Sequence, residues 1–409
     1  MCDTNPFHLL SEVSAGLEAA AELRRDLHAH PELGFEEHRT AGIVARTLRA
    51  FGCDEVYEGV GQTGVVGVIR GGRRDTEHLV SIGLRADLDA LPLEEKTGHP
   101  WASTIPNRMH ACGHDGHVAG LLLAAHALVR RKDDLEGDVV LIFQPGEEGY
   151  AGARAMLEDG LLERFPCTEI YGAHAAAELP LGHFGFTRGT ASAAADRFTI
   201  TVKGLGGHGG RPHKTVDPVA AAGLLITALQ TVVSRSIDPM HPAVVSIGSI
   251  HGGDPDGVSV VPAEVVLAGT TRCGTPEDRD RIEARMNEIC AGIGATTGAE
   301  IVLDYIRMYP PLVNHDEPYE FASAFAACLY GTERINRRHP ASMGAEDFSF
   351  FLEQRPGCFF RVGIADENHA ANAHHPMFDY NDKALGPTAD FFVRLTEERL
   401  SALRERSEA

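Results

Sequence analysis

The sequence predicts an α/β protein of two domains, a larger one with a mixed, largely parallel sheet flanked by helices and a smaller inserted α+β domain. The chain has 409 residues, more than the roughly 250 to 300 at which one hydrophobic core usually stops growing. Its 43% of hydrophobic residues can fill two cores. Strand-like runs alternate with helical patterns toward both ends, while the middle follows another order. We therefore expect residues 1–190 plus 308–409 to form the larger domain and residues 191–307 the inserted one.

The elements of the larger domain follow from the spacing of apolar residues. Val13, Leu17 and Leu27 recur at helical intervals, and such spacing predicts helices over 8–29 and 37–51. The next segments predict strands at 63–69, 79–85, 139–144 and 169–172, and helices at 116–130 and 150–162. Strands that alternate with helices of this length form a largely parallel sheet. Segments 342–351 and 359–363 resemble the first domain again in their pattern of apolar residues, and the chain ends in a helix over 388–406.

The inserted domain has its own order of elements, which starts near residue 190. The patterns predict a strand at 197–203, a glycine-rich turn at 204–210, a helix at 217–233, strands at 243–250 and 264–271, a helix at 276–293 and a strand at 300–305. This β-α-β-β-α-β order is typical of a small antiparallel sheet backed by two helices, the ferredoxin-like arrangement.

Charge and composition exclude several classes of function. The chain has 37 Lys and Arg against 58 Asp and Glu, and the formal charge of −21 argues against nucleic acid or anionic membranes as partners. The segment from Met1 to Leu10 lacks the basic and apolar parts of a signal peptide, and later segments fall short of about 18 uninterrupted apolar residues. The eight cysteines are scattered, which argues against a disulfide framework. We expect a cytoplasmic enzyme.

Residues 109–117, Met-His-Ala-Cys-Gly-His-Asp-Gly-His, carry the strongest chemical signal. Cys112 and His114 stand two residues apart, and a thiolate with an imidazole suits a divalent ion such as Zn²⁺. Further on, Glu148 can add an oxygen ligand, and its neighbour Glu147 can handle a proton. Singly, these residues can be a buried cysteine, a loop histidine and a helix N-terminus that favours acidic side chains. Together they favour a metal site.

Other polar residues follow the predicted strands. Asp87 and Asp89 come just after 79–85, and His174 comes just after Ile170 and Tyr171. Ligands of parallel sheets gather beyond the carboxyl ends of the strands, so these side chains are expected near Cys112. The alternative interpretations are a solvated strand end for the two aspartates and a loop histidine for His174.

Five motifs in a fixed order extend this signal. They are Arg-Ala-Asp-Leu-Asp-Ala-Leu-Pro at 85–92, His-Ala-Cys-Gly-His-Asp-Gly-His at 110–117, Gln-Pro-Gly-Glu-Glu at 144–148, Gly-Gly-His-Gly-Gly at 206–210 and His-His-Pro-Met-Phe-Asp at 374–379. From about Leu23 to Leu385 the chain resembles the metal-dependent amidohydrolases that include hippurate hydrolase, N-acyl-amino-acid deacetylases and auxin-conjugate hydrolases, a branch of the aminoacylase and carboxypeptidase superfamily. The resemblance implies a metal-binding catalytic domain and an inserted lid and dimerisation domain.

The resemblance also implies roles for single residues. The metal-ligand positions fall on Cys112, His114, Glu148, His174 and His374, with His375 as a rival of His374. Five ligands exceed one tetrahedral shell, so two divalent ions are expected, Mn²⁺, Zn²⁺ or Co²⁺. Glu147 matches the general base that moves a proton from metal-bound water to the leaving amine. Asp87 and Asp89 match accessory catalytic positions around the ligands.

In the inserted domain the resemblance points to two residues. His208 matches a histidine that reaches the active site of a partner subunit and stabilises the oxyanion. Arg272 matches the arginine that grips the substrate carboxylate, with Arg361 as a weaker rival. A turn histidine and a solvated arginine are the alternatives. The chain departs from its relatives at Ser259–Pro262, where an asparagine that can contact substrate is absent, and at Ala175–Ala177, whose small side chains predict a roomier pocket.

Taken together, these observations predict hydrolysis of an N-acyl amino acid, hippurate-like or N-acetyl, to a carboxylic acid and a free amino acid. The expected partners are this small-molecule substrate and a second subunit, in a homodimer or dimer-based oligomer. A dipeptidase or carboxypeptidase on the same scaffold is the alternative within enzymes. Outside enzymes the alternative is a non-catalytic metal-binding or assembly module, against which the Glu147–Glu148 pair argues. Catalysis by Cys112 as nucleophile with His114 is disfavoured by their two-residue spacing.

Overall fold

A computed structural model describes residues 8–75 and 77–407, so Cys2 and most of the segment from Met1 to Leu10 lie outside the described part. The chain divides into two compact units. Unit 1 comprises residues 1–189, 313–340 and 350–409, and unit 2 comprises 190–312 and 341–349. These bounds differ from the expected ones at residues 190, 308–312 and 341–349, which group with unit 2. Residues 341–349 do so because Ser342 forms a β-bridge with Ser192, and Ala193 N donates to Ser342 O at 3.0 Å.

The predicted mixed α/β fold of unit 1 is confirmed by an eight-stranded sheet. Its strands follow the order β1 (Glu55–Val60), β2 (Gly64–Ile69), β4 (Asp138–Gln144), β3 (Ser81–Asp87), β5 (Glu169–Pro180), β16 (Gly357–Ala365), β6 (Phe184–Phe186) and β15 (Ile335–Asn336). The central strands β4, β3, β5 and β16 run parallel, whereas β1, β2 and β6 pair antiparallel with a neighbour. Strands β2, β3 and β4 are buried along their whole length, as their continuous apolar runs require.

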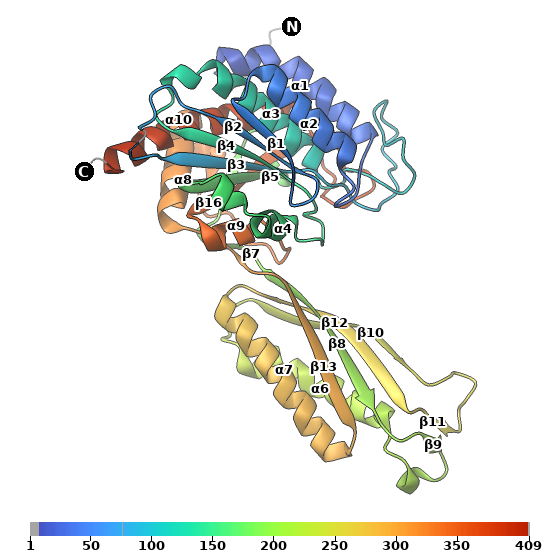
Figure 1. Cartoon of the computed structure of the whole chain (residues 1–409). Coiled ribbons are helices and arrows are strands. Elements are labelled where there is room, and N and C mark those ends of the chain that lie inside the picture. Colours follow the sequence, from blue (N-terminus) through green and yellow to red (C-terminus); the bar gives the residue numbers. More distant parts are fainter. Residues whose placement is uncertain (1–7, 76, 408–409) are drawn as a thin grey trace. The chain divides into compact units, whose positions relative to one another are not determined.

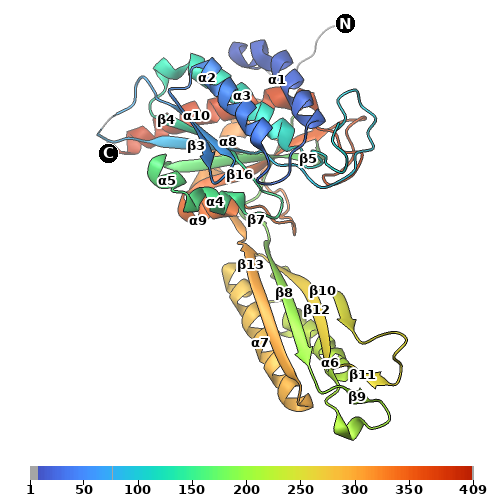
Figure 2. The same ribbon diagram turned by 45° about the vertical axis from the view of Figure 1, so that its right-hand side comes forward.

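Helices cover both faces of this sheet. They are α1 (Ser11–Ala29), α2 (His38–Phe51), α3 (His114–Arg130), α4 (Gly152–Glu158), α5 (Leu161–Arg164), α8 (Asp316–Tyr330), α9 (Ser349–Gln354) and α10 (Leu385–Ser407). Figures 1 and 2 show α1, α2 and α3 on one face and α4 and α9 on the other. A single helix was predicted over 150–162, but the structure has two short helices, α4 and α5. Gly160, which lies between them, has a positive φ of 79° and interrupts the helical backbone.

Unit 2 has the predicted order of elements. Its four-stranded antiparallel sheet runs β10 (Ala243–Gly252), β12 (Glu264–Cys273), β8 (Ala194–Lys203) and β13 (Glu300–Tyr309), and the helices α6 (Pro218–Thr231) and α7 (Pro276–Thr297) pack against it. The short strands β9 (Gly207–His208) and β11 (Val260–Val261) pair with each other. The strands β7 (Gly189–Ser192) and β14 (Leu312–Asn314) lie where the chain passes between the units.

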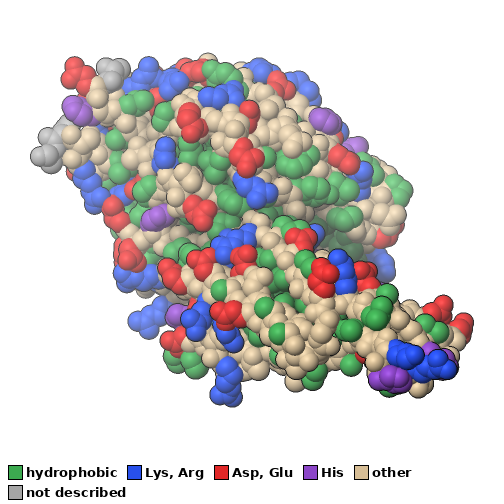
Figure 3. All heavy atoms as spheres, turned by 60° about the horizontal axis from the view of Figure 1, so that its bottom comes forward, with side chains coloured by type: hydrophobic (Ala, Val, Ile, Leu, Met, Phe, Trp, Pro, Cys, Tyr) green, Lys and Arg blue, Asp and Glu red, His purple; other side chains and the backbone are tan. Residues whose placement is uncertain are grey.

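The stretch Pro218–Ser236, which contains α6, is long and apolar enough by length and composition to cross a membrane, a test that core helices of soluble proteins also pass. In this structure one side of the helix contributes Ala221, Leu225 and Leu229 to the core of unit 2. On the face of the molecule in Figure 3, acidic and basic side chains are interspersed with hydrophobic ones.

We expect the core of unit 2 to depend on the buried side of α6. Leu225 is fully buried, whereas its neighbour Leu224 is 52% exposed. Leu225→Ala should lower the free energy of unfolding by about 3 kcal/mol, because it removes buried methyl groups and leaves a cavity. Leu224→Ala, the control, should change it by less than about 0.5 kcal/mol. Urea denaturation followed by circular dichroism measures both, and equal effects would contradict the assignment of this helix face.

Candidate metal centre

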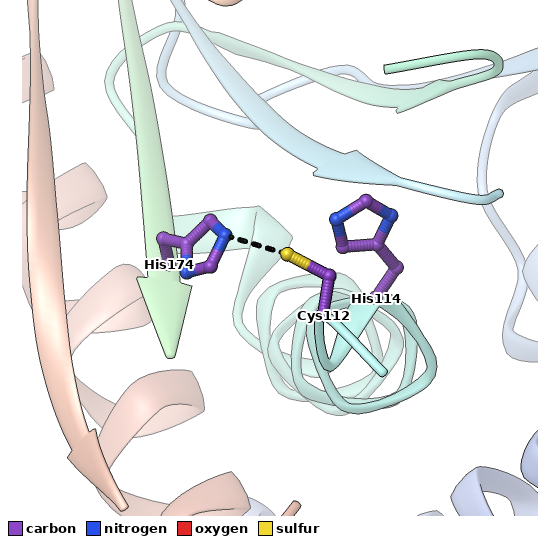
Figure 4. Close-up of side chains that lie close together, drawn as sticks. All are labelled: Cys112, His114 and His174. Carbon is purple, nitrogen blue, oxygen red and sulfur yellow. Dashed lines mark hydrogen bonds between the residues drawn. The ribbon is translucent and has the colours of Figure 1, made fainter. Parts of the chain in front are cut away.

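A tight turn brings Cys112 and His114 to the same side of the chain. Gly113, between them, is the N-cap of α3 and has a φ of 86°, a left-handed conformation that favours glycine. A Cβ atom there would lie 3.2 Å from the Tyr380 ring and 3.3 Å from the Phe378 ring, so these rings would have to shift by a few tenths of an ångström. Figure 4 shows the two side chains side by side, with His174 of β5 facing the sulfur.

Two groups of side chains whose spacing suits a metal ion share Cys112. Its Sγ lies within 4.8 Å of ligand atoms of His114 and His174 in one group, and of Glu148 and His374 in the other. The Cys112 Sγ and His174 Nε2 atoms are 3.3 Å apart, and His374 Nε2 lies 3.0 Å from Glu148 Oε1. The first distance is near that between two donors on one tetrahedral ion with bonds of about 2.3 and 2.0 Å. The five predicted ligands therefore converge around one sulfur.

Backbone carbonyls orient two of these imidazoles. His114 Nδ1 lies 2.8 Å from Asp89 O, and His174 Nδ1 lies 2.7 Å from Ala175 O. Because a carbonyl oxygen only accepts, each Nδ1 carries a hydrogen, which leaves Nε2 as the nitrogen that can bind a metal ion. His114 Nε2 is buried and has no hydrogen-bond partner among the described residues. This donor set fits a metal ion, because an unsatisfied buried imidazole nitrogen is otherwise unfavourable.

His117 belongs to a third group with Asp87 and His114, but its nitrogens are occupied. Its Nδ1 donates to Asp87 Oδ1 at 2.6 Å, and its Nε2 accepts from Ala175 N at 2.9 Å. Asp87 Oδ2 in turn accepts from Arg85 at 2.7 Å. The group is thus a hydrogen-bonded brace between α3 and the residue after His174. The sequence signal was present, since His117 follows His114 by three positions on one helix face, but no role was predicted for it.

The loop Gly146–Glu148 is held by two buried carboxylates. Asp89 accepts from Glu147 N at 3.0 Å and from Glu148 N at 2.9 Å, and Glu37 accepts from Gly146 N at 2.8 Å. The Thr63 hydroxyl donates to the other Glu37 oxygen at 2.6 Å. Burial raises the pKa of Glu37 to about 7. The ligand atoms of His114, Glu147 and Glu148 lie within 4.8 Å of one another, so the loop places Glu147 beside the cluster. Sequence reasoning did not identify Glu37.

The backbone of His374 has an uncommon conformation at the point where its side chain enters the cluster. Its φ is 65°, uncommon for a residue with a Cβ, and its N–H donates to Ala111 O at 2.7 Å. The neighbouring His375 instead accepts from Met377 N through Nδ1 at 3.1 Å and belongs to no metal-binding group within the described part of the chain. The structure therefore brings His374, and not its rival, next to Cys112.

The cluster is strongly coupled electrostatically. Burial, followed by the charge of Glu148, raises the pKa of the Cys112 thiol. Hydrogen bonds to Cys112 and Glu148 raise the pKa of His374 to about 10. Burial, followed by the charge of Arg361, holds the pKa of His174 well below its usual range. A divalent cation bound here would compete with protons for Cys112 and His374.

A buried ionic network anchors the start of α3 below the cluster. Asp115, next to His114, lies 2.8 Å from His28 Nδ1 and 3.5 Å from Arg24. Arg24 also pairs with Asp379 at 3.0 Å and Asp382 at 2.7 Å. Although burial favours the neutral imidazole, the Asp115 carboxylate raises the pKa of His28 to about 9. The network ties α1, α3 and the segment after His374 together.

The remaining predicted residues, His208 and Arg272, lie in unit 2. His208, on β9, is exposed and accepts from Gly210 N at 3.0 Å through Nδ1. Arg272, on β12, is half-buried and donates to Thr271 O at 2.8 Å and to the Thr270 hydroxyl.

Comparisons with known proteins place these residues in context. Residues 83–398 match the model of Peptidase family M20/M25/M40. The chain is 40% identical over 377 residues to hippurate hydrolase of Campylobacter jejuni, covering 91% of this chain and 94% of that protein. It is 38% identical to thermostable carboxypeptidase 1 of Saccharolobus solfataricus, covering 85% and 86%. A Bacillus subtilis structure described as a dinuclear metal binding peptidase superposes with a TM-score of 0.82 at 35% identity, covering 95% of this chain and 99% of that one.

The His28–Asp115 pair predicts a pH-dependent stability. A raised folded-state pKa stabilises the fold fully below pH 6.5, the unfolded value, and this contribution disappears as pH rises through about 9. The difference in unfolding free energy between wild type and His28→Gln should therefore fall by up to about 3 kcal/mol between these pH values. Denaturant titrations of chelator-treated protein measure it. His30→Gln, at a side chain 40% exposed, is the control. A difference independent of pH would contradict the assignment.

Proposed function

Because the chain belongs to Peptidase family M20/M25/M40, we propose that it hydrolyses the amide bond of N-acyl amino acids, releasing a carboxylic acid and a free amino acid. It is a metal-dependent amidohydrolase. The observation that carries the substrate proposal furthest is the convergence of two ligand groups on Cys112 Sγ with Glu147 beside them. Hydrolysis of an unactivated amide needs both a polarised carbonyl and a placed base, and this cluster has residues for both.

We assign Cys112, His114, Glu148, His174 and His374 as ligands of two divalent ions. The two groups that share Cys112 would hold these ions, and Mn²⁺, Zn²⁺ and Co²⁺ all accept such mixed donors. When bound, the ions supply Lewis acidity to the amide carbonyl and lower the pKa of a bound water to about 7. His114 and His174 are oriented for this by their Nδ1 bonds to backbone carbonyls.

Glu147 is the proposed general base. It takes a proton from the attacking water and delivers it to the amine nitrogen as the amide bond breaks. Asp89 positions it by holding the backbone N–H groups of Glu147 and Glu148. Asp87 acts through His117 rather than on Glu147 in this proposal. Its carboxylate binds Arg85 and His117, and it thereby holds His117 in place next to His174. Both aspartates are therefore positioning residues in this proposal.

The remaining assignments concern unit 2 and the assembly. We propose that His208 stabilises the oxyanion in the site of a partner subunit and that Arg272 binds the substrate carboxylate. Both roles require unit 2 to act as a lid and dimerisation domain in a homodimer. A cytoplasmic location accords with the charge of −21 and with a small, polar substrate.

A carboxypeptidase or dipeptidase activity is the second candidate. It is favoured by the 38% identity to a protein named thermostable carboxypeptidase 1. The two activities need the same metal centre and differ in what occupies the acyl side of the amide. A substrate comparison distinguishes them directly.

Turnover of N-acyl amino acids should depend on metal. Chelator-treated protein should release no amino acid from acetyl, benzoyl, longer acyl or indolyl derivatives, and added Mn²⁺, Zn²⁺ or Co²⁺ should restore release because the ligands then hold their ions. Quantification of free amino acid measures the rates. Faster cleavage of dipeptides than of every acyl derivative would support the second candidate. Full activity of protein shown by elemental analysis to be metal-free would refute the proposal.

Removal of the proposed base should separate catalysis from metal binding. Glu147→Gln should lower kcat by about 10³-fold, because the amide cannot accept the proton, while the backbone N–H of residue 147 still binds Asp89. The metal content per chain, measured by elemental analysis, should not change. Glu158→Gln, at a side chain 73% exposed, is the control and should retain wild-type activity. Retention of most activity by Glu147→Gln would exclude this residue as the base.

A further inference from the structure

An irregular loop of unit 1 leads directly to Cys112. Residues 92–108, here called the Trp101 loop, connect β3 with α3 and contain no helix or strand. At the base of the loop Leu91 and Met109 exchange two backbone hydrogen bonds of 3.0 Å, just before Cys112 in the chain. Inside the loop Glu95 accepts from Ser103 N at 2.6 Å. The loop is therefore a compact unit with closed ends, held by its own side chains.

Trp101, the single tryptophan of the chain, attaches this loop to α1. The His99 ring stacks on the indole, with ring centroids 4.9 Å apart and an angle of 12° between the planes. From α1, Arg25 Cζ lies 4.3 Å and Arg24 Cζ lies 5.6 Å from the centroid of the indole ring. Indole is the aromatic group that attracts a cation over its face most strongly. The two arginines of α1 thus hold the loop through one ring.

Two contacts join the Trp101 loop to the segment that carries His374. The Lys96 N–H donates to Pro376 O at 2.8 Å, two residues after His374. The Trp101 Nε1–H donates to Asp379 Oδ1 at 3.4 Å. Asp379 is buried, so water competes little for this bond. A displacement of the indole would therefore reach the His374 segment at two points.

His374 depends on such contacts more than the other imidazoles of the cluster. His114 stands on α3 and His174 on β5, whereas residues 366–381 form no helix or strand. The His374 side chain is 54% exposed, and its backbone is tied to the cluster by its N–H bond to Ala111 O. Its position is therefore set by the loops packed against its segment rather than by the ladder of a regular element.

We propose that Trp101 is a positioning residue for His374 and sets the affinity for the metal ion on the His374 side of the cluster. This inference rests on the proposed function, in which His374 is a ligand of one of two divalent ions. The indole acts through Asp379 and through the bond from its loop to Pro376. Loss of the stack with His99 and Arg25 would release the loop and weaken one ion selectively.

Zinc titrations of chelator-treated protein, in competition with a chromophoric chelator, test this proposal. Wild type should show two binding steps, and His374→Ala identifies the step of the His374 side by weakening it. Trp101→Ala should weaken that same step by about 10-fold or more and the other step by less than about 3-fold, as expected for a residue that supports a ligand. Trp101→Phe should restore most of the affinity, because the phenyl ring keeps the stack and loses only the 3.4 Å hydrogen bond.

Three controls separate positioning from general damage to the fold. In the His374→Ala background, Trp101→Ala should change zinc affinity by less than about 2-fold, because the ligand through which it acts is gone. His99→Ala, at a side chain 38% exposed, removes one stacking partner and its 3.5 Å approach to Asp379, and should weaken the same step by about 3-fold. Tyr57→Ala removes a ring that contacts Arg164 on the outermost strand of the sheet and should leave both steps unchanged.

The contrary results are distinct. Equal weakening of both steps by Trp101→Ala, or an undiminished effect in the His374→Ala background, would make the loop a general support of unit 1 and overturn the proposal. Wild-type affinity of Trp101→Ala, or no recovery by Trp101→Phe, would overturn it as well. If Trp101→Ala does not fold, wild-type affinity of His99→Ala at both steps has the same meaning. Wild-type zinc binding by His374→Ala would instead refute the ligand assignment made under the proposed function, and the role of Trp101 with it.

Discussion

The carboxylate and the backbone carbonyl of Asp89 together hold two of the segments that carry the candidate metal ligands. The carbonyl accepts the Nδ1 hydrogen of His114, and the carboxylate accepts the N–H groups of Glu147 and Glu148. The residue is almost fully buried, so water does not compete for these bonds. One residue therefore fixes the spacing between His114, Glu148 and the neighbouring Glu147. The rest of the cluster is arranged around this fixed frame.

The sheet supplies that frame because β4, β3 and β5 are adjacent and parallel. Asp87 is paired with Gln144, so Asp89 and the Gly146–Glu148 loop leave the sheet at the same level. His174 is on the next strand, and α3 brings Cys112 and His114 to the same edge. Residues about 30 to 60 positions apart in sequence thus meet without any long irregular segment, as expected at the carboxyl edge of a parallel sheet.

The fold and much of the cluster could be predicted from local signals. Cys112, His114 and Glu148 stand in short motifs whose residue types indicate metal binding. The alternation of strand-like runs with helical patterns predicted the sheet. The helix α8 was not predicted, because its buried positions Tyr319, Ala322 and Ala326 give a weak apolar stripe. Glu37 and His117 were missed for another reason: their importance arises from hydrogen bonds to Gly146 and Ala175, and partners so distant in the sequence leave no periodic trace. The placement of residues 341–349 likewise depends on a single long-range β-bridge.

The two ligand groups differ in their access to solvent. His114 is buried, whereas the His374 side chain is 54% exposed and stands on a strained backbone segment. For two ions bound as proposed, this asymmetry makes the site kinetically unequal. An ion on the His374 side would lie open to water and to competing ions, whereas an ion held by His114 would be shielded from both. The identity of the metal at the His374 side would then follow the free ion concentrations around the enzyme more closely than that of the metal at the buried side.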